Sequence, residues 1–400
     1  MARTFVWPSV LLAALAAIAG CTERITTPGP CPALCPSHEI QLADTLLAVV
    51  DTADTTARGY VVTSEATYLA ASSLDSLKSF VLMRFGKVQT SWLQSTTDTV
   101  QAVFPPDSLF VELQYVFQDT AAHPRLVFYR LPATFDTTAN YAQAQAYFVD
   151  AAVLDTVPVP DTTAGNLEFR LPSTVVPAAA DSGIVAIGAR VIADKPTVVA
   201  FSSGHSTTTA PQLAYFVHGQ PPQDSLSRSL PDTATFTTFV QSPEPGIPPA
   251  GTLAIGGLPA AHTLIHLTLP KVAVDSVGIV RATLSLSLVH PVVAFPGDSF
   301  FVNAFPILRD FGPKSVLFPD TSITGVKVVH AGDTGTVQID IARILRLWGT
   351  TSGDSMPRAI MLGVFAEGFV LGEADVKGRV GGGGPQLRVT YVKKYEAGVP

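Results

Sequence analysis

Charged residues are scarce in this sequence, at 14% of 400 residues, and they form no basic cluster. The formal net charge is −7 at pH 7. Nucleic-acid binding is therefore not expected, because it requires a positively charged patch or stripe. Cysteine and tryptophan are also rare, with 3 residues each, whereas the chain has 32 Pro and 30 Gly and is 47% hydrophobic. This composition favours β-structure with many turns and argues against disorder and against a coiled coil.

Long apolar runs are absent apart from one at the N-terminus, where residues 1–20 read as a signal peptide. Arg3 supplies the positive charge, and the apolar stretch Phe5–Ala19 is too short for a stable membrane span. The stretch ends in Ile-Ala-Gly-Cys21, which resembles the lipobox of bacterial lipoproteins. The resemblance implies lipidation of Cys21, and Thr22 in place of Asp implies retention at the outer membrane. The small residues before Cys21 also suit ordinary signal-peptidase cleavage, so a soluble secreted protein stays open as the alternative.

Residues 21–41 are rich in Pro and Thr and are predicted to form a stiff tether. Outside the reducing cytosol, Cys31 and Cys35 form an even pair that favours a small structural disulfide. A redox-active pair is more often Cys-x-x-Cys, and a zinc site with nearby His38 would lack a fourth ligand. We therefore expect no metal and no cofactor.

An internal repeat organises the rest of the chain. The segment 381–392 reads GGGGPQLRVTYV, and the segment 207–217 reads TTTAPQLAYFV, with the two prolines 174 residues apart. Four hundred residues exceed the usual limit of a single core, so two similar domains are expected. We predict domain 1 at 42–218, a polar linker at 219–232, domain 2 at 233–395 and a tail at 396–400.

Seven segments recur in the same order in the two halves, and both sets have the β-branched, aromatic or alternating pattern of strands. The pairs are Ala66–Ala71 with Gly251–Gly257, Ser79–Val88 with Thr263–Val272, Phe110–Phe117 with Val280–Val289, Leu126–Leu131 with Phe300–Leu308, Asn166–Leu171 with Thr336–Ile341, Ile184–Val191 with Ala359–Phe365, and Leu213–Val217 with Leu387–Val392. A helical spacing of apolar residues predicts one short helix over Ala342–Trp348, with Trp348 in the core.

The second half resembles the bacterial DNRLRE domain family in its pattern. The matching motifs are Leu253–Gly257, Thr263–Leu269, Ala282–Leu286, Val337–Ile341 followed by Trp348, and Pro385–Tyr391. The first half keeps Phe80–Phe85, Phe201–Ser203 and Pro211–Phe216. The Arg of the family's Ser-Arg-Glu motif is absent from both halves. The resemblance implies an all-β protein of two tandem jelly-roll β-sandwiches, on secreted or surface proteins, often beside carbohydrate-active domains and usually without catalysis.

Other residue patterns have weaker functional interpretations. His262 and His266 could bind zinc if they lay on a helix, but in a strand residues four apart lie about 13 Å from one another. They are therefore predicted to be structural or solvent-facing. Glu367, Glu373 and Asp375 fall in one segment and could act as the carboxylates of a glycoside-cleaving enzyme. The aromatic residues Trp92, Tyr141 and Tyr147 are candidates for stacking on a sugar ring.

These observations together predict a non-catalytic, membrane-anchored lipoprotein that acts as a surface binding or adhesion module. Its predicted partners are the membrane, through the N-terminal lipid, and a glycan or another envelope component. Two alternatives stay open, namely a glycoside-cleaving enzyme and a purely structural envelope protein.

Overall fold

The structure is a computed structural model. It describes residues 42–48, 54–59, 62–75, 77–87, 91–93, 101–103, 108–172, 175, 184–206, 209–218, 227–229, 232–242, 246, 248–257, 260–269, 278–295, 297–350, 355–365, 367–380 and 382–392. The predicted signal peptide, tether and tail lie outside these residues, and so do Cys21, Cys31 and Cys35.

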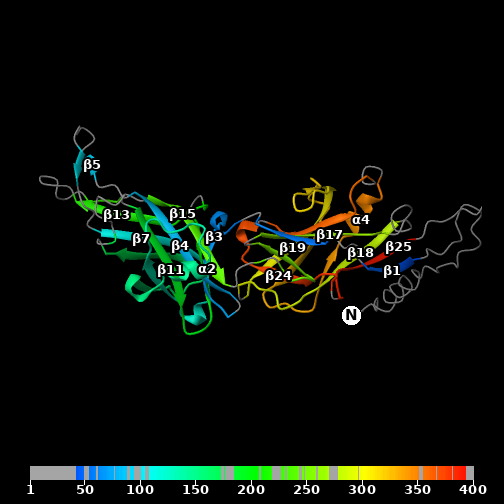
Figure 1. The fold of residues 1–400 in the computed structure, drawn as a ribbon, viewed down its shortest axis with the longest axis horizontal. Coiled ribbons are helices and arrows are strands. Elements are labelled where there is room, and N and C mark those ends of the chain that lie inside the picture. Colours follow the sequence, from blue (N-terminus) through cyan, green and yellow to red (C-terminus); the bar gives the residue numbers. More distant parts are fainter. Residues whose placement is uncertain are drawn as a thin grey trace, which may run out of the picture. The chain divides into compact units, whose positions relative to one another are not determined.

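The protein is mostly β, as the sequence predicts, and its strands form large antiparallel sheets (Figure 1). In the first half the strands are β1 (Leu42–Ala48), β2 (Thr55–Arg58), β3 (Tyr68–Ser73), β4 (Lys78–Lys87), β5 (Ser91–Leu93), β6 (Gln101–Val103), β7 (Ser108–Gln118), β8 (Arg125–Arg130), β9 (Val153–Pro158), β10 (Gly165–Leu171), β11 (Ile184–Ile192), β12 (Val198–Ser202) and β13 (Gln212–His218). They are followed by β14 (Ser227–Ser229), β15 (Asp232–Ser242), β16 (Thr252–Gly257), β17 (Ala260–His266), β18 (Gly278–Ser287), β19 (Ser299–Arg309), β20 (Val316–Leu317), β21 (Gly325–His330), β22 (Thr336–Asp340), β23 (Ala359–Val364), β24 (Glu373–Lys377) and β25 (Gln386–Val392).

The same order of strand pairing occurs in both halves. The larger sheet contains β12-β3-β4-β11-β8-β9 in the first half and β24-β16-β17-β23-β19-β21 in the second. The remaining pairs are β13-β7-β10 in the first half and β25-β18-β22 in the second. In the first half β7 also pairs with β12, so all of these strands belong to one 11-stranded sheet, whereas β25-β18-β22 belong to a separate 4-stranded sheet. Each of the seven segment pairs predicted from the sequence occupies corresponding places in these two orders. The more specific jelly-roll assignment stays a prediction.

The predicted boundary between the two domains is wrong, because strands cross it in both directions. β15 follows the predicted linker but pairs with β4 over Ala234–Ser242, and it also pairs with β13. β2 precedes the first set of strands but pairs with β17 of the second set. β14 lies inside the predicted linker and pairs with β13. Composition indicated a polar linker, but it cannot tell which sheet edge offers a partner to the strand that follows.

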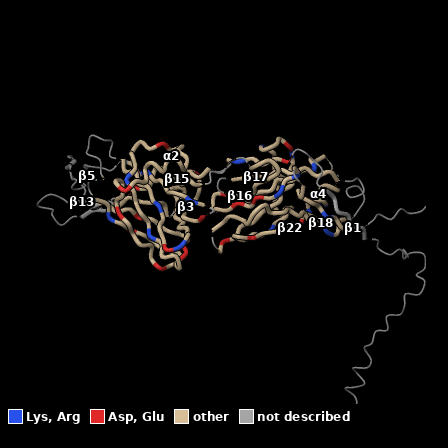
Figure 2. Tube along the Cα trace, turned by 60° about the horizontal axis from the view of Figure 1, so that its bottom comes forward, with Lys and Arg blue, Asp and Glu red and all other residues tan. Residues whose placement is uncertain are grey.

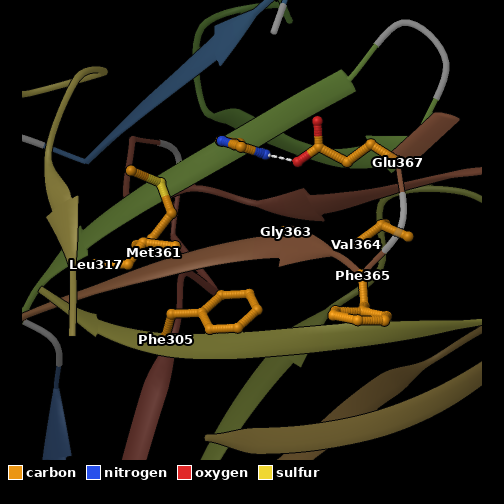
Figure 3. Close-up of a pocket in the computed structure, with 8 residues that line it drawn as sticks. Phe305, Leu317, Met361, Gly363, Val364, Phe365 and Glu367 are labelled. Carbon is orange, nitrogen blue, oxygen red and sulfur yellow. Dashed lines mark hydrogen bonds and ion pairs between the residues drawn. The ribbon is translucent and has the colours of Figure 1, made fainter. Parts of the chain in front are cut away.

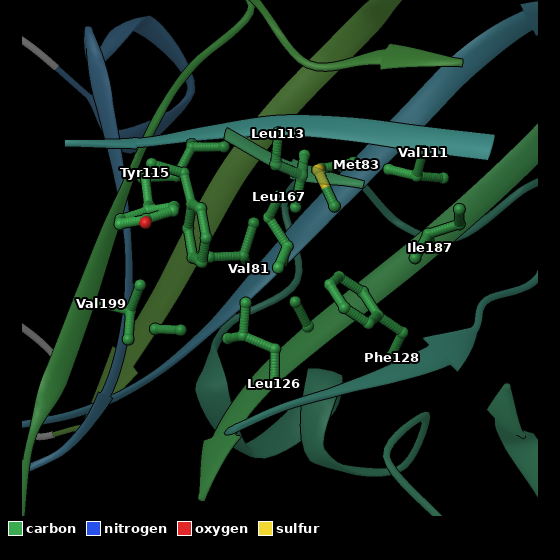
Figure 4. Close-up of a cluster of buried hydrophobic side chains, with 14 of the residues drawn as sticks. Val81, Met83, Val111, Leu113, Tyr115, Leu126, Phe128, Leu167, Ile187 and Val199 are labelled. Atoms are coloured by element: carbon green, nitrogen blue, oxygen red, sulfur yellow. The ribbon is translucent and has the colours of Figure 1, made fainter. Parts of the chain in front are cut away.

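Two large hydrophobic cores lie within these sheets. The first is built from β3, β4, β7, β8, β10, β11, β12 and neighbouring strands (Figure 4). The second includes Leu387, Val389 and Trp348, which are all at most 1% exposed. Complete burial of a leucine side chain stabilises the fold by about 1.5–3 kcal/mol. The predicted core positions of the closing strand and of Trp348 are therefore confirmed.

The predicted helix is also confirmed, as α4 (Ala342–Trp348). Ala342, Ile344, Leu345 and Trp348 are buried, which gives the helix one apolar face against the core. At its start, the backbone N–H of Ala342 donates to Oδ1 of Asp340. A second short helix, α2 (Tyr141–Gln145), begins at a capping box in which Asn140 and Gln143 each accept the other's backbone N–H.

The larger sheet of the first half is covered on its outer face as well. A third apolar cluster lies there, formed by Phe80 and Leu82 of β4, by residues of β8, β11 and β15, and by the connection between β8 and β9. That connection, residues 131–152, contains α2. The matching outer face of the second half carries only a small cluster among the described residues: Leu264, Ile307, Ala359 and Met361, with Phe305 packed against it.

Candidate functional site

Two of the three carboxylates predicted to form a catalytic group are adjacent on the edge strand β24. Ala374 and Val376 of this strand point into the second core, so Glu373 and Asp375 point to the opposite face. Arg58 of β2 binds Glu373 through two hydrogen bonds, from Nη1 to Oε2 (2.6 Å) and from Nη2 to Oε1 (2.7 Å). A Cβ on Gly256, the β16 residue opposite Glu373, would lie 3.1 Å from Oε2 of this carboxylate. The glycine therefore leaves room for the ion pair.

Asp375 is paired with His290, whose Nε2 lies 2.8 Å from Oδ2 of the carboxylate. Burial and the neighbouring negative charge of Glu373 raise the pKa of Asp375. The pKa of His290 is also raised, first by the hydrogen bond that its Nδ1–H donates to the carbonyl oxygen of Pro291 (3.1 Å), and then by Asp375. The two ring nitrogens of His290 thus both face acceptors, which favours the imidazolium form.

Glu367, the third carboxylate, has a different partner. It lies in the short 3-10 helix Glu367–Phe369 and forms an ion pair with Nε2 of His262. Each of the three carboxylates therefore has its own cationic or imidazole partner. A glycosidase needs two carboxyl groups that face one open space with room for the sugar. Here each carboxylate faces its own cationic or imidazole partner rather than a shared open space.

The two histidines of the His-x-x-x-His pattern lie on β17, at places four residues apart on one face. His262 pairs with Glu367, and Nε2 of His266 lies 2.7 Å from Oδ2 of Asp310. This hydrogen bond lowers the pKa of Asp310, together with the backbone N–H of Gly312. The histidines thus have separate acidic partners, in agreement with the predicted structural role. Among the described residues, no group of three His, Cys, Asp or Glu side chains has the arrangement of a metal site.

The aromatic residues predicted to stack on a sugar have other positions. Tyr141 stacks on Phe80 with ring centroids 4.6 Å apart, and Tyr147 packs against the same apolar cluster. Their rings cover the outer face of the sheet, because burial of aromatic area lowers the free energy of the folded state. Trp92 lies in β5, which pairs with β6, and its side chain is outside the described part of the structure.

A polar groove lies on the outer face of the strands β22, β18 and β25. It has a volume of about 390 Å³ and is lined by Arg281, Thr283, Ser285, Ser287, Thr336, Gln338, Gln386 and Arg388. The pairing places these side chains side by side, with Ser285 between Gln338 and Gln386, and Arg388 opposite Thr283. The sequence signal was present in the alternation of residues 281–287, whose apolar members fill the core. Sequence analysis predicted a strand there but did not select its polar face as a site.

The corresponding face of the first half carries two glutamates, with Arg170 exposed two residues from one of them. There Glu112 of β7 lies opposite both Glu168 of β10 and Gln212 of β13. By strand position, Glu112 and Glu168 correspond to Ser285 and Gln338 of the polar groove. Acidic and basic residues are interspersed along both halves (Figure 2), so the two arginines of the groove are a local feature of its face.

An apolar pocket of about 390 Å³ lies on the outer face of the larger sheet of the second half (Figure 3). It is lined by His262, Phe305, Leu317, Met361, Gly363, Val364, Phe365 and Glu367. The His262–Glu367 ion pair forms one wall, and the rings of Phe305 and Phe365 lie on the side away from it. Sequence reasoning did not predict this pocket.

Comparison with known proteins places the chain in no established group. No protein-family model matches the sequence, and no curated protein matches it. The resemblance to the DNRLRE family therefore stays a prediction. In the described part of the chain, no helix has the length and apolar character needed to cross a membrane.

Proposed function

We propose that this protein is an exported, lipid-anchored, non-catalytic binding protein whose second half binds an acidic glycan. The polar groove on β22, β18 and β25 carries this proposal. Its hydroxyl and amide side chains can exchange hydrogen bonds with sugar hydroxyls. Its two arginines, Arg281 and Arg388, suit the carboxylate or sulfate groups of an acidic glycan, because a guanidinium group binds such anions through two parallel hydrogen bonds.

The charged residues on the matching faces of the two halves support an acidic ligand that binds only to the second half. Glu112 and Glu168 on the corresponding face of the first half would repel a polyanion. The three carboxylates on which the alternative glycosidase hypothesis depends are paired with Arg58, His262 and His290. The groove therefore supports glycan binding better than these carboxylates support glycoside cleavage.

Lipidation of Cys21 would hold the protein at a membrane and present the groove to envelope or extracellular polymers. Two or three acyl chains give stable anchoring, whereas one chain gives only marginal binding. The Cys21→Ser variant should move from the membrane fraction to the soluble fraction after cell lysis. A wild-type protein that is soluble after export, or a variant that stays with the membrane, would refute the anchoring part of the proposal.

The binding part is tested with the soluble Cys21→Ser protein on an array of neutral and acidic glycans. We expect binding to acidic glycans that weakens as salt rises, because the contacts are ionic. Arg281→Ala with Arg388→Ala should reduce binding tenfold or more, whereas Arg125→Ala, an exposed arginine of β8, should not. Binding that is unchanged in the double variant, or no binding to any glycan, would refute the assignment.

A further inference from the structure

The apolar pocket of the second half lies on the same face of the sheet as a filled site in the first half. Gly188 of β11 lies between Leu82 of β4 and Tyr129 of β8. Gly363 of β23, the corresponding strand, lies opposite Asn303 of β19 and next to the ring of His262 of β17. The strand orders β4-β11-β8 and β17-β23-β19 match, so the two glycines lie on corresponding strands, and both face away from the cores.

In the first half an aromatic ring fills the space above this glycine. A Cβ on Gly188 would lie 2.7 Å from Cζ of Phe148, so the ring rests directly on the glycine. Phe148 is buried and stacks on Phe80, with ring centroids 4.3 Å apart. It comes from the connection between β8 and β9, which folds back over the sheet.

In the second half the space above the glycine is open. The connection between β19 and β21, residues 310–324, contributes β20 and places Leu317 at the rim of the pocket. The three atoms nearest to a Cβ on Gly363 all belong to His262, at 3.2 Å or more, so they line one side only. The pocket volume of about 390 Å³ is within the range of sites that hold small ligands or large side chains.

The pocket is continuous with an exposed apolar surface. Phe365 at its rim is 68% exposed, and Phe301, Val316, Leu317 and Val326 are exposed too. Phe301 lies two residues from Asn303 on β19, and Val326 pairs with Asn303, so both lie beside the pocket on the same face. Single exposed apolar residues are ordinary, but a contiguous group of them marks an interaction surface.

We propose that this pocket receives an aromatic side chain from another polypeptide, as the corresponding outer face of the first half receives Phe148 from its own chain. Phe305, Phe365 and the sulfur of Met361 provide the aromatic and thioether contacts that such a ring favours. The occupant is a polypeptide because a free ring would fill the pocket but leave the apolar surface around it uncovered.

The test is a selection of displayed random peptides on the soluble, full-length Cys21→Ser protein. Enriched peptides should share one aromatic residue, and replacing that residue by alanine should weaken binding tenfold or more. Phe365→Ser, which removes a pocket wall at an exposed position, should weaken binding to a similar extent. Gly363→Leu, which fills the pocket from its floor, should do the same. Phe311→Ser is the matched control, because Phe311 is exposed to a similar degree but does not line the pocket.

Three outcomes would refute the proposal: no enriched peptide, enriched peptides without an aromatic residue, or binding that survives both pocket variants. Binding of N-acetyl-tyrosine amide as tightly as the best peptide would also refute it, since the site would then take a small molecule. The pocket variants should leave acidic-glycan binding unchanged, because the polar groove lies on other strands. Failure of one proposal is thus distinguishable from failure of the other.

Discussion

The two halves of the molecule have the same strand order but differ in what covers the outer face of the larger sheet. In the first half, residues 131–152 fold over that face and bury it with Phe135, Ala144 and Phe148. In the second half, the shorter connection 310–324 leaves a pocket above Gly363. The comparison indicates that the inward-facing residues determine the strand order, whereas one connecting loop determines whether the outer face is core or surface.

The halves also differ in charge at matching positions. Glu373 and Asp375 of β24 correspond to Val198 and Ala200 of β12, which are completely buried. The two carboxylates are compatible with the fold because Glu373 pairs with Arg58 and Asp375 pairs with His290. A buried carboxylate without such a partner would cost several kcal/mol.

The largest effect should come from the closing strands, where the two halves are alike. Leu213 and Leu387 occupy matching buried positions, and a carboxylate there has no partner. Leu387→Asp and Leu213→Asp should each lower the free energy of unfolding by about 5 kcal/mol or more, which is comparable with the stability of a whole domain. Denaturant unfolding followed by circular dichroism measures this, with Gln386→Asp, at an exposed position, as the control. Variants that unfold like the parent would contradict the assignment of these strands to the cores.

The next prediction concerns the covered and open faces directly. Phe148→Ala removes a ring that packs on Gly188 and Phe80, so it should cost about 3–5 kcal/mol of stability. Phe365→Ala removes an exposed ring and should change stability by no more than about 0.5 kcal/mol. The two variants are compared by their denaturation midpoints in the same buffer. Equal effects would mean that the two faces do not differ in burial.

A smaller effect is expected at the strand that crosses the predicted domain boundary. The side chains of Arg58 and Glu373 are 16% and 26% exposed, so loss of one leaves the other only partly solvated. Arg58→Met should cost about 1–3 kcal/mol, whereas Arg281→Met on the exposed polar face should cost about 0.5 kcal/mol or less. Adding Glu373→Gln to Arg58→Met should recover part of the loss. Purely additive effects would show that the two residues are not coupled.

The smallest expected effect is a pH dependence of stability from His290 and Asp375. The first half has no titratable side chain at the position that matches Asp375, where Ala200 lies. The pKa of His290 is raised above 6.5 in the folded protein, so the proton is bound more tightly in the folded state than in the unfolded one. Its contribution to stability is present below pH 6.5 and is lost as the pH rises through the raised pKa. The raised pKa of Asp375 acts in the same direction, because ionisation of this carboxyl costs more in the folded state.

Stability should therefore fall modestly between pH 6.5 and alkaline pH, and His290→Gln should flatten that part of the profile. Denaturation midpoints measured across this range test the prediction. The carboxyl part of the dependence begins at pH 3.8 and extends up to the raised pKa of Asp375, so it is measured by extending the midpoints to acidic pH. Asp375→Ala, which introduces the side chain that Ala200 has in the first half, should remove this part. A midpoint that rises with pH in the wild-type protein would contradict the assigned direction of both pKa shifts.

The sequence by itself determined the strands, the helix Ala342–Trp348 and the buried positions Leu387, Val389 and Trp348. These follow from the local alternation of apolar and polar residues, which fixes the face that each side chain presents. Only the tertiary structure decided the partners of β2 and β15, because a free strand edge anywhere in the chain can accept a strand. It also decided the ion pairs Arg58–Glu373 and His262–Glu367, whose members are 315 and 105 residues apart in the sequence. The packing of Tyr141 and the pocket above Gly363 depend on how one loop folds over a sheet, and no local pattern specifies that path.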